Sequence, residues 1–436
     1  ISDMVQTLDA GGDQDKDNSG WESIYARQSW IGRLNYDFND KYLFEFIFRR
    51  DGSLKFPPNS RWGNFPAALF AWRASEEDFW KENLSFIDYF KFRSSYGQMG
   101  MDPGAPFQYI NKYSLAPGMT MGTNKVVNTK IYQSVIANPN ITWEKQSTFN
   151  VGFDSHILNR LFHLNAEFFF NERSDILSPR DASVPSYTGL SLPSENIAIV
   201  NNRGFEVEAG FHKQINSDLR IDINGNMSWN RNKVVFTDEP ARSVPWQVRT
   251  GHPYGTHLVY NAIGIFKSQE EVDNYPHWSG AKPGDVIFED YNNDGVINAD
   301  DRILIDKTDA PELFYGLMFD LNYKNLAISI QGQGQGDYFK SVIEGNRGIG
   351  QNVFKWMATD YWTPENSNTD VARPFHRADQ YWSYLSNSNT YWYDNMAYFR
   401  LKNVIVSYNL PQKFISSIGL KNVNIFASGY NLFLIH

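Results

Sequence analysis

The stretch Leu219–Asn230 reads LRIDINGNMSWN and alternates almost without interruption between apolar and polar side chains. Successive side chains of an extended strand point to opposite faces of its sheet, so this stretch predicts a strand with one apolar and one polar face. The apolar face would hold Leu219, Ile221, Ile223, Met227 and Trp229. The polar face would hold Arg220, Asp222, Asn224, Asn226, Ser228 and Asn230.

The same alternation recurs along most of the chain, interrupted in turn by short turns and by long polar loops. One face of the second strand is nearly all aromatic, with Tyr42, Phe44, Phe46 and Phe48. The pattern predicts about twelve strands of roughly ten residues, with short turns at one end and long loops at the other. The expected strands are Trp21–Phe38, Lys41–Arg49, Asn64–Arg73, Phe86–Gly97, Lys145–His156, Leu161–Asn171, Gly204–Phe211, Leu219–Asn230, Leu313–Tyr323, Leu326–Gln335, Ala397–Tyr408 and Val423–Leu432.

Two all-β architectures fit such alternation. A soluble sandwich or propeller alternates because one face of each sheet is buried. A transmembrane barrel alternates because one face meets lipid and the other a polar lumen. The strict order of short turns and long loops, and the aromatic residues at strand ends, favour the barrel. We therefore predict an all-β fold, an antiparallel transmembrane β-barrel with short periplasmic turns and long extracellular loops.

Composition excludes several other classes. No apolar run in the 436 residues approaches the ~20 residues that a membrane-spanning helix needs. The absence of cysteine excludes disulfides and thiolate metal sites within this sequence. A net charge of −9 argues against nucleic-acid binding, which needs clustered Lys and Arg. Because the first residues show no charged and apolar signal pattern, we expect the sequence to begin after any signal or inside a longer protein.

An acidic loop carries the most specific local motif. Residues 290–301 read DYNNDGVINADD, with oxygen-bearing side chains at positions 1, 3, 5, 9 and 12 and glycine at position 6. That spacing predicts a calcium loop. A polar turn that satisfies only backbone groups is the alternative. Aspartate at position 12 makes the loop resemble the dockerin type, and we expect a structural role. The expected ligands are Asp290, Asn292, Asp294, the Val296 carbonyl, Asn298 and Asp301.

Two further patterns resemble functional sites. Glu206 and Glu208 lie on one face of a strand, a spacing that could suit an acid/base pair, but alternate residues of a barrel strand line a wet lumen in any case. We read them as lumen residues and expect no enzymatic activity. The glycines Gly332, Gly334 and Gly336 end a strand without a following helix, so they do not predict a nucleotide site, and we expect a flexible strand end.

The expected loop 337–396 is dense in aromatic residues. Such rings can stack on sugar faces or anchor a protein interface, whereas loop packing and a membrane-interface girdle are the alternatives for any single ring. As a group they are the best candidates for a substrate cavity or an interface. The candidate residues are Trp356, Tyr361, Trp362, Tyr381, Trp382, Tyr384, Tyr391 and Trp392.

Ordered motifs add a family resemblance. Arg50-Asp51-Gly52-Ser53, then Phe56 and the run from Asn59 to Pro66, resemble the RDGSxxF…NRWGxFP pattern of SusC/RagA-type TonB-dependent transporters of Bacteroidetes. Further matches follow in family order up to Phe433. They are Phe92–Gly97, Asn138-Pro139-Asn140 with Trp143-Glu144-Lys145, Asn202–Glu206, Gly284-Asp285 with the acidic loop, Tyr315-Gly316, Phe399–Asn403 and Tyr430–Phe433.

The resemblance implies active import of oligomeric nutrients, oligosaccharides first and oligopeptides second, through an outer-membrane barrel of about 22 strands. It also implies a SusD-like lipoprotein lid over the extracellular mouth, TonB-ExbB-ExbD acting through a plug domain, and a dimer of SusCD-like pairs. No stretch matches a plug, a TonB box or the closing strand, so residues 1–436 resemble the C-terminal half of the barrel, with 231–312 and 337–396 as extracellular loops. A passive porin, a role in another outer-membrane complex, and a secreted carbohydrate-binding β-protein remain alternatives.

Overall fold

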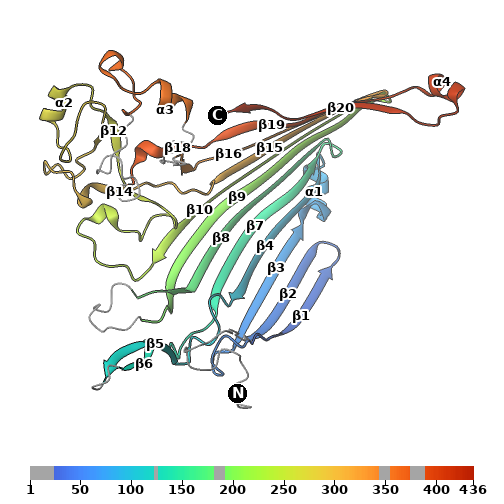
Figure 1. The fold of residues 1–436 in the computed structure, drawn as a ribbon. Coiled ribbons are helices and arrows are strands. Elements are labelled where there is room, and N and C mark those ends of the chain that lie inside the picture. The colour runs from blue at the N-terminus through green and yellow to red at the C-terminus, as the bar shows by residue number, and fades with distance from the viewer. Residues whose placement is uncertain (1–23, 122–125, 181–191, 343–353, 374–387) are drawn as a thin grey trace.

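The computed structural model describes residues 24–121, 126–180, 192–342, 354–373 and 388–436. Twelve antiparallel strands form one sheet, and every strand pairs with its neighbours in the sheet without a crossover (Figure 1). These strands are β1 (Arg27–Phe38), β2 (Tyr42–Ser53), β3 (Trp62–Arg73), β4 (Ile87–Met101), β7 (Glu144–Ile157), β8 (Phe162–Ser178), β9 (Glu195–Asn216), β10 (Leu219–Phe236), β15 (Leu313–Tyr323), β16 (Leu326–Gly336), β19 (Tyr398–Asn409) and β20 (Asn424–Ile435). The prediction of twelve alternating strands is confirmed.

The sheet curves, and its connections separate by length (Figure 1). The short-turn end carries the tight turns together with the small helices α1 (Asp78–Asn83) and α4 (Gln412–Ile415). At the turn between β1 and β2, Asn39 and Asp40 both have φ of 56°, the left-handed conformation that a tight hairpin requires at its two central positions. The opposite end of the sheet, the long-loop end, carries the long connections.

Strand register sorts the side chains as the alternation predicts. Ile223 of β10 lies opposite Phe211 of β9, and Asn226 lies opposite Glu208. The apolar face is exposed, with Phe44 and Phe46 each nearly half accessible. The polar face carries the carboxylates and amides. No helix among the described residues is both long and apolar enough to span a membrane.

Two long connections at the long-loop end carry structure of their own. The connection from β10 to β15 holds β11 (Leu258–Tyr260), β12 (Ala262–Ile265), α2 (Gln269–Asn274), β13 (Val286–Phe288) and β14 (Arg302–Leu304). The connection from β16 to β19 holds β17 (Phe339–Ser341), α3 (Lys355–Thr359) and β18 (Tyr393–Asn395). Short 3-10 turns lie at Ala74–Glu76, Pro245–Gln247, Ala299–Asp301, Pro364–Asn366, Thr390–Trp392 and Ser416–Ile418.

These two connections pack into one body, which we call the loop unit: the described residues of 237–312 and 337–396. Its core is a cluster of buried side chains from the first connection, against which Ala372 and Tyr391 of the second connection pack. Backbone hydrogen bonds also join the two, since Tyr260 N–H donates to the Ser388 carbonyl at 2.9 Å. The buried cluster consists of Tyr260, Trp278, Val286, Phe288 and Ile297.

Several strand bounds differ from the prediction. β8 and β9 extend beyond the expected ends, because residues such as Glu172, Asn201 and Asn202 pair along the backbone without alternating with apolar residues. A hairpin of β5 (Lys112–Met121) and β6 (Val126–Val135) lies within the segment expected to be loop, 98–143. A second core consists of Phe56, Phe65, Ile141 and Trp143, and Tyr109 and Leu177 pack against it.

The glycines Gly332, Gly334 and Gly336 end a strand as predicted, because Gly336 is the last residue of β16. All three pair with β15, and the flexibility of this end stays a prediction. A Cβ at Gly332 would overlap the Phe399 ring, and one at Gly334 would overlap the Tyr315 ring. The two rings stack with 2° between their planes. The glycines therefore let neighbouring aromatic side chains lie across the strand, a known way to stabilise glycine in a sheet.

Candidate functional site

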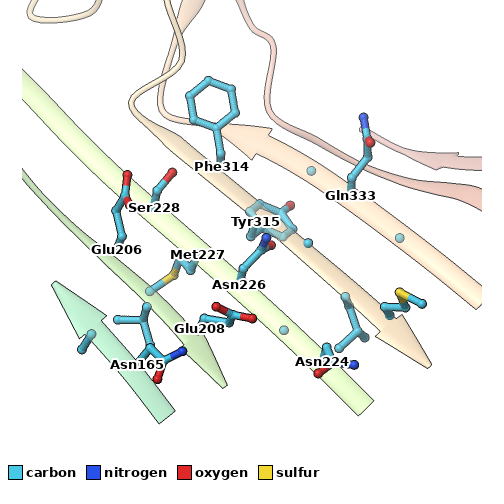
Figure 2. Close-up of a pocket in the computed structure, with 18 of the residues that line it drawn as sticks. Asn165, Glu206, Glu208, Asn224, Asn226, Met227, Ser228, Phe314, Tyr315 and Gln333 are labelled. Atoms are coloured by element: carbon cyan, nitrogen blue, oxygen red, sulfur yellow. The ribbon is translucent and has the colours of Figure 1, made fainter. Parts of the chain in front are cut away.

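A cavity of about 920 Å³ lies against the polar face of the sheet (Figure 2). Strands β8, β9, β10, β15 and β16 supply most of its wall, so the site is built on paired strands rather than on loops. The wall is rich in side-chain amides, each of which can both donate and accept hydrogen bonds. The amide residues that line it are Asn165, Asn224, Asn226, Gln331, Gln333 and Gln335.

The charges of this cavity are unbalanced. Four carboxylates and one guanidinium belong to its described lining. That guanidinium, Arg93, lies 3.3 Å from the Asp154 carboxylate and also pairs with Glu167. Glu206 stands opposite Glu167 in the register of β8 and β9. Figure 2 shows Glu206 and Glu208 on one strand, as the alternation predicts.

Two histidines that are far apart in the sequence meet on the same face of the sheet as this cavity. His163 Nδ1 lies 3.0 Å from His212 Nε2, and the rings stack with 14° between their planes. His212 Nδ1 in turn lies 2.9 Å from the Asp222 carboxylate. Gly210 makes room for this arrangement, because a Cβ there would overlap the His163 ring. Sequence spacing gave no sign of the pair, since only strand register brings the two residues together.

The acidic loop curls around its own carboxylates. Asp290 accepts hydrogen bonds from the Asp294 and Gly295 amides at 3.1 and 2.8 Å. Asp301, which is fully buried, accepts from the Tyr291 amide at 3.0 Å and from the Asn298 amide at 2.7 Å. Gly295 has φ of 82°, so it supplies the sharp turn that the motif predicts.

Side chains from outside the loop fix it in the loop unit. Trp278 Nε1 donates to the Ile297 carbonyl at 3.0 Å, and Trp246 Nε1 donates to the Asp300 carbonyl at 2.9 Å. The described part of the chain contains no group of three or more His, Asp or Glu side chains arranged to hold a metal. The expected donor set also counts two asparagines and a carbonyl, so its oxygen chemistry suits calcium. Calcium binding stays a prediction.

The aromatic candidates occupy different environments. Tyr391 and Trp392 meet edge to face, and the Tyr391 hydroxyl accepts a hydrogen bond from the Ala372 amide at 2.9 Å. Trp356 is exposed and stacks on Phe354, with ring centroids 6.1 Å apart.

The other aromatic candidates that the structure describes are less exposed to solvent than Trp356. Tyr361 is half-buried and forms a backbone bridge with Val371. Trp362 lies across Gly284, where a Cβ would come within 2.8 Å of its ring. Tyr381, Trp382 and Tyr384 lie outside the described residues. Tyr391 packs on the core of the loop unit, and Trp356 is the most exposed of the candidates described. A role of the group in a cavity or interface stays a prediction.

Gly284 and Asp285, which the sequence singled out only as a family motif, form the clamp between the two connections. The Asp285 carboxylate is buried and accepts two hydrogen bonds from the Arg373 guanidinium. The Gly284 carbonyl accepts the Arg373 backbone N–H at 2.9 Å. No sequence pattern predicted Arg373 as the partner, because 88 residues separate it from Asp285.

Comparison with known proteins assigns the chain to a family. No protein-family model matches it. TonB-dependent receptor P3 of Formosa agariphila is 31% identical over 422 residues, which cover 93% of this chain and 40% of that protein. TonB-dependent receptor SusC of Bacteroides thetaiotaomicron is 28% identical over 313 residues, which cover 69% of this chain and 30% of that protein. The chain belongs to the SusC/RagA-type family of TonB-dependent receptors.

The fold agrees with this family. A solved structure described as the RagAB peptide transporter aligns with a TM-score of 0.70 at 20% identity, covering 94% of this chain and 44% of that chain. This SusC/RagA-type chain is therefore part of an outer-membrane β-barrel, and the secreted β-protein alternative is excluded. The matched relatives are described as receptors and transporters. It spans about two fifths of the length of the curated relatives it matches first.

Proposed function

We propose that the complete receptor imports oligomeric nutrients across the outer membrane by TonB-dependent active transport. Membership of the SusC/RagA-type family supports the transport class. The cavity on the polar face carries the proposal for this chain, because its amides and carboxylates offer hydrogen bonds to a polar cargo moving along the lumen. Oligosaccharides are the proposed cargo, and oligopeptides are the second candidate, which the described role of the RagAB neighbour favours.

The proposed partners act at the two ends of the barrel. A SusD-like lipoprotein would close the extracellular mouth over the loop unit, where the exposed pair Phe354 and Trp356 offers apolar contact. TonB-ExbB-ExbD would act from the periplasm through the plug of the full-length protein. Two such receptor and lipoprotein pairs would form the dimer, and the apolar face of the strands would contact outer-membrane lipid.

Calcium is part of this proposal as a structural ion. Asp290, Asn292, Asp294, Asn298 and Asp301 would supply side-chain oxygens, with the Val296 carbonyl as the sixth ligand, at the spacing that calcium loops use. Bound there, the ion would add oxygen bonds inside a loop already held by its own amides. The loop unit would become more rigid, which suits a surface that must meet a lid reproducibly.

The decisive experiment is purification of the full-length receptor from outer membranes in mild detergent. Co-purification of a lipoprotein, and capture of an oligosaccharide from the growth medium by the complex, would support the proposal. A receptor that purifies without a lipoprotein, binds no oligomer and does not need TonB for uptake would contradict it. Such a result would favour a passive porin, or a SusC-like barrel that serves another outer-membrane complex. A plug domain and a TonB box in the full-length protein would argue against the porin.

A further inference from the structure

The strongest feature outside the expected sites is the uneven charge of the cavity on the polar face. Its described lining holds Asp154, Glu167, Glu206 and Glu208 against the single cation Arg93. Arg93 is already engaged by Asp154 and Glu167. Among the described residues, neither Glu206 nor Glu208 lies within ion-pair distance of a lysine or arginine. Glu208 has a histidine neighbour, His163, whose Nε2 lies 3.6 Å from a carboxylate oxygen.

Neither carboxylate is paired with a lysine or arginine of the described residues, and both line the cavity that a passing cargo would meet. Glu206 stands opposite Ser228, and Glu208 stands opposite Asn226, on adjacent strands (Figure 2). Residues two apart on one strand are about 6.6 Å apart along it and share a face. The Glu208 side chain is 57% exposed, so its charge is open to the lumen. The neighbouring amides are neutral and offset none of this charge.

A concave wall that carries one sign of charge concentrates counter-ions and repels ions of its own sign. The amides Asn165, Asn224 and Asn226 can bind the hydroxyl or amide groups of a neutral oligomer, since they both donate and accept. An oligomer with sulfate, phosphate or carboxylate groups would bring like charges next to Glu206 and Glu208. It would find no free cation among the described lining residues, because Arg93 is engaged.

We propose that Glu206 and Glu208 are specificity-determining residues that exclude polyanionic oligomers from the lumen and admit neutral or amine-bearing ones. This inference rests on the proposed import function, because it names the class of cargo that the same cavity passes. The two carboxylates act through the potential they create along the wall. Neither needs to hold the cargo in one fixed geometry.

The absence of cysteine from the chain allows a test that does not depend on knowing the cargo. Ser228→Cys places one thiol opposite Glu206, and Thr148→Cys places one on the same face, beside a pocket whose carboxylate, Glu45, is paired with Arg33. The full-length receptor with its co-purified partners, with any cysteine outside this chain replaced by serine, is treated with two methanethiosulfonate reagents. One reagent carries a quaternary ammonium group and the other carries a sulfonate.

The measured quantity is the ratio of the cationic to the anionic labelling rate, normalised to the same ratio for a free thiol in solution. We expect the ratio at Ser228→Cys to exceed that at Thr148→Cys by about tenfold, the low end of the enrichment that charged clefts produce. Adding Glu206→Gln and Glu208→Gln should bring the two ratios together. Salt at 1 M should do the same by screening. A Thr148→Cys labelling rate that is the same with and without the two glutamine substitutions shows that the barrel remains folded.

Four results would overturn the inference. Equal ratios at the two positions would mean that the wall carries no selective potential. A ratio that survives both glutamine substitutions would assign the potential to other groups. Failure of both reagents to reach Ser228→Cys would mean that the wall is covered in the full-length receptor and meets no cargo. Capture of a polyanionic oligomer by the purified complex would also reject the inference while leaving import intact, so the two proposals can fail separately.

Discussion

The Asp285 carboxylate accepts hydrogen bonds from Nε and a terminal nitrogen of Arg373 at 3.0 and 3.1 Å, although the two residues come from different loops. The Asp285 side chain is 1% exposed and the Arg373 side chain is 20% exposed, so the pair is largely shielded from water. Removing one member of such a pair leaves the other buried without its partner. Among the described residues, the pair is thus the most deeply buried of the ion pairs that join the two connections of the loop unit.

Asp285→Asn should therefore loosen the loop unit without unfolding the barrel. We expect a local loss of about 3 kcal/mol, typical when one member of a buried ion pair is removed. Hydrogen exchange of residues 258–305 and 354–373 is the measurement, and both segments should exchange faster. Lys267→Ala is the matched control, because Lys267 pairs across the same two loops with Asp370, which is 94% exposed. Its effect should stay below about 1 kcal/mol, and equal effects of the two substitutions would refute the special role of Asp285.

Gly284→Ala should be more harmful than Gly280→Ala, although both glycines have φ above 80°. Both substitutions force alanine into a left-handed conformation, which costs about 1–2 kcal/mol. At Gly280 nothing lies within 4 Å of the new Cβ, whereas at Gly284 the Cβ would press on Trp362 and Arg373. We expect a shift in tryptophan fluorescence and faster proteolysis of the loop unit only for Gly284→Ala. Identical behaviour would show that the Trp362 contact is unimportant.

Calcium removal should loosen the acidic loop. If the free calcium concentration is 100 times the dissociation constant of the site, chelation removes about 2.7 kcal/mol of stabilisation. Hydrogen exchange of residues 285–305 should then increase on chelation, and Asp294→Asn should weaken the calcium response. Asp300→Asn is the control, because its carboxylate accepts the Ser243 hydroxyl at 2.5 Å and is not in the expected ligand set. An unchanged exchange pattern after chelation would eliminate the calcium assignment.

Acid should weaken the short-turn end through Glu77, which lies between β3 and α1. Hydrogen bonds from Tyr42, Lys41 and Trp72 to its carboxylate lower the pKa of Glu77 from 4.5 to about 2. A carboxyl whose pKa is lowered by folding stabilises the fold above its unfolded pKa and loses that contribution as pH falls toward the folded value.

Thermal unfolding of the detergent-solubilised receptor between pH 6 and pH 2 tests this expectation. The wild type should lose stability mainly between pH 4.5 and pH 2, and Glu77→Gln should lack that part of the pH dependence. Glu76→Gln removes a carboxylate that is paired with the exposed Lys81, and it should keep the wild-type profile. Parallel pH profiles for the wild type and Glu77→Gln would contradict the assignment.

The strands were predictable because alternation is a local signal. The alternation in Leu219–Asn230 predicts both faces of its strand, and the placement of Glu206 and Glu208 on the polar face follows from the same periodicity. The ends of β8 and β9 were missed because residues such as Asn201 and Asn202 pair through their backbone and show no apolar face. The loop unit was missed because its contacts, such as Asp285 with Arg373, join positions that no local pattern relates.

The shared core of the loop unit has a consequence for exchanging specificity between receptors of this family. Tyr391 of one connection packs on a cluster that belongs to the other, and the Ala262 N–H donates to the Thr390 hydroxyl across the same boundary. Transplanting either loop alone would expose to water the apolar surface that packs against the other loop. Chimeric receptors should therefore be built by grafting both loops as a single cassette, with the strands beneath serving as an interchangeable base.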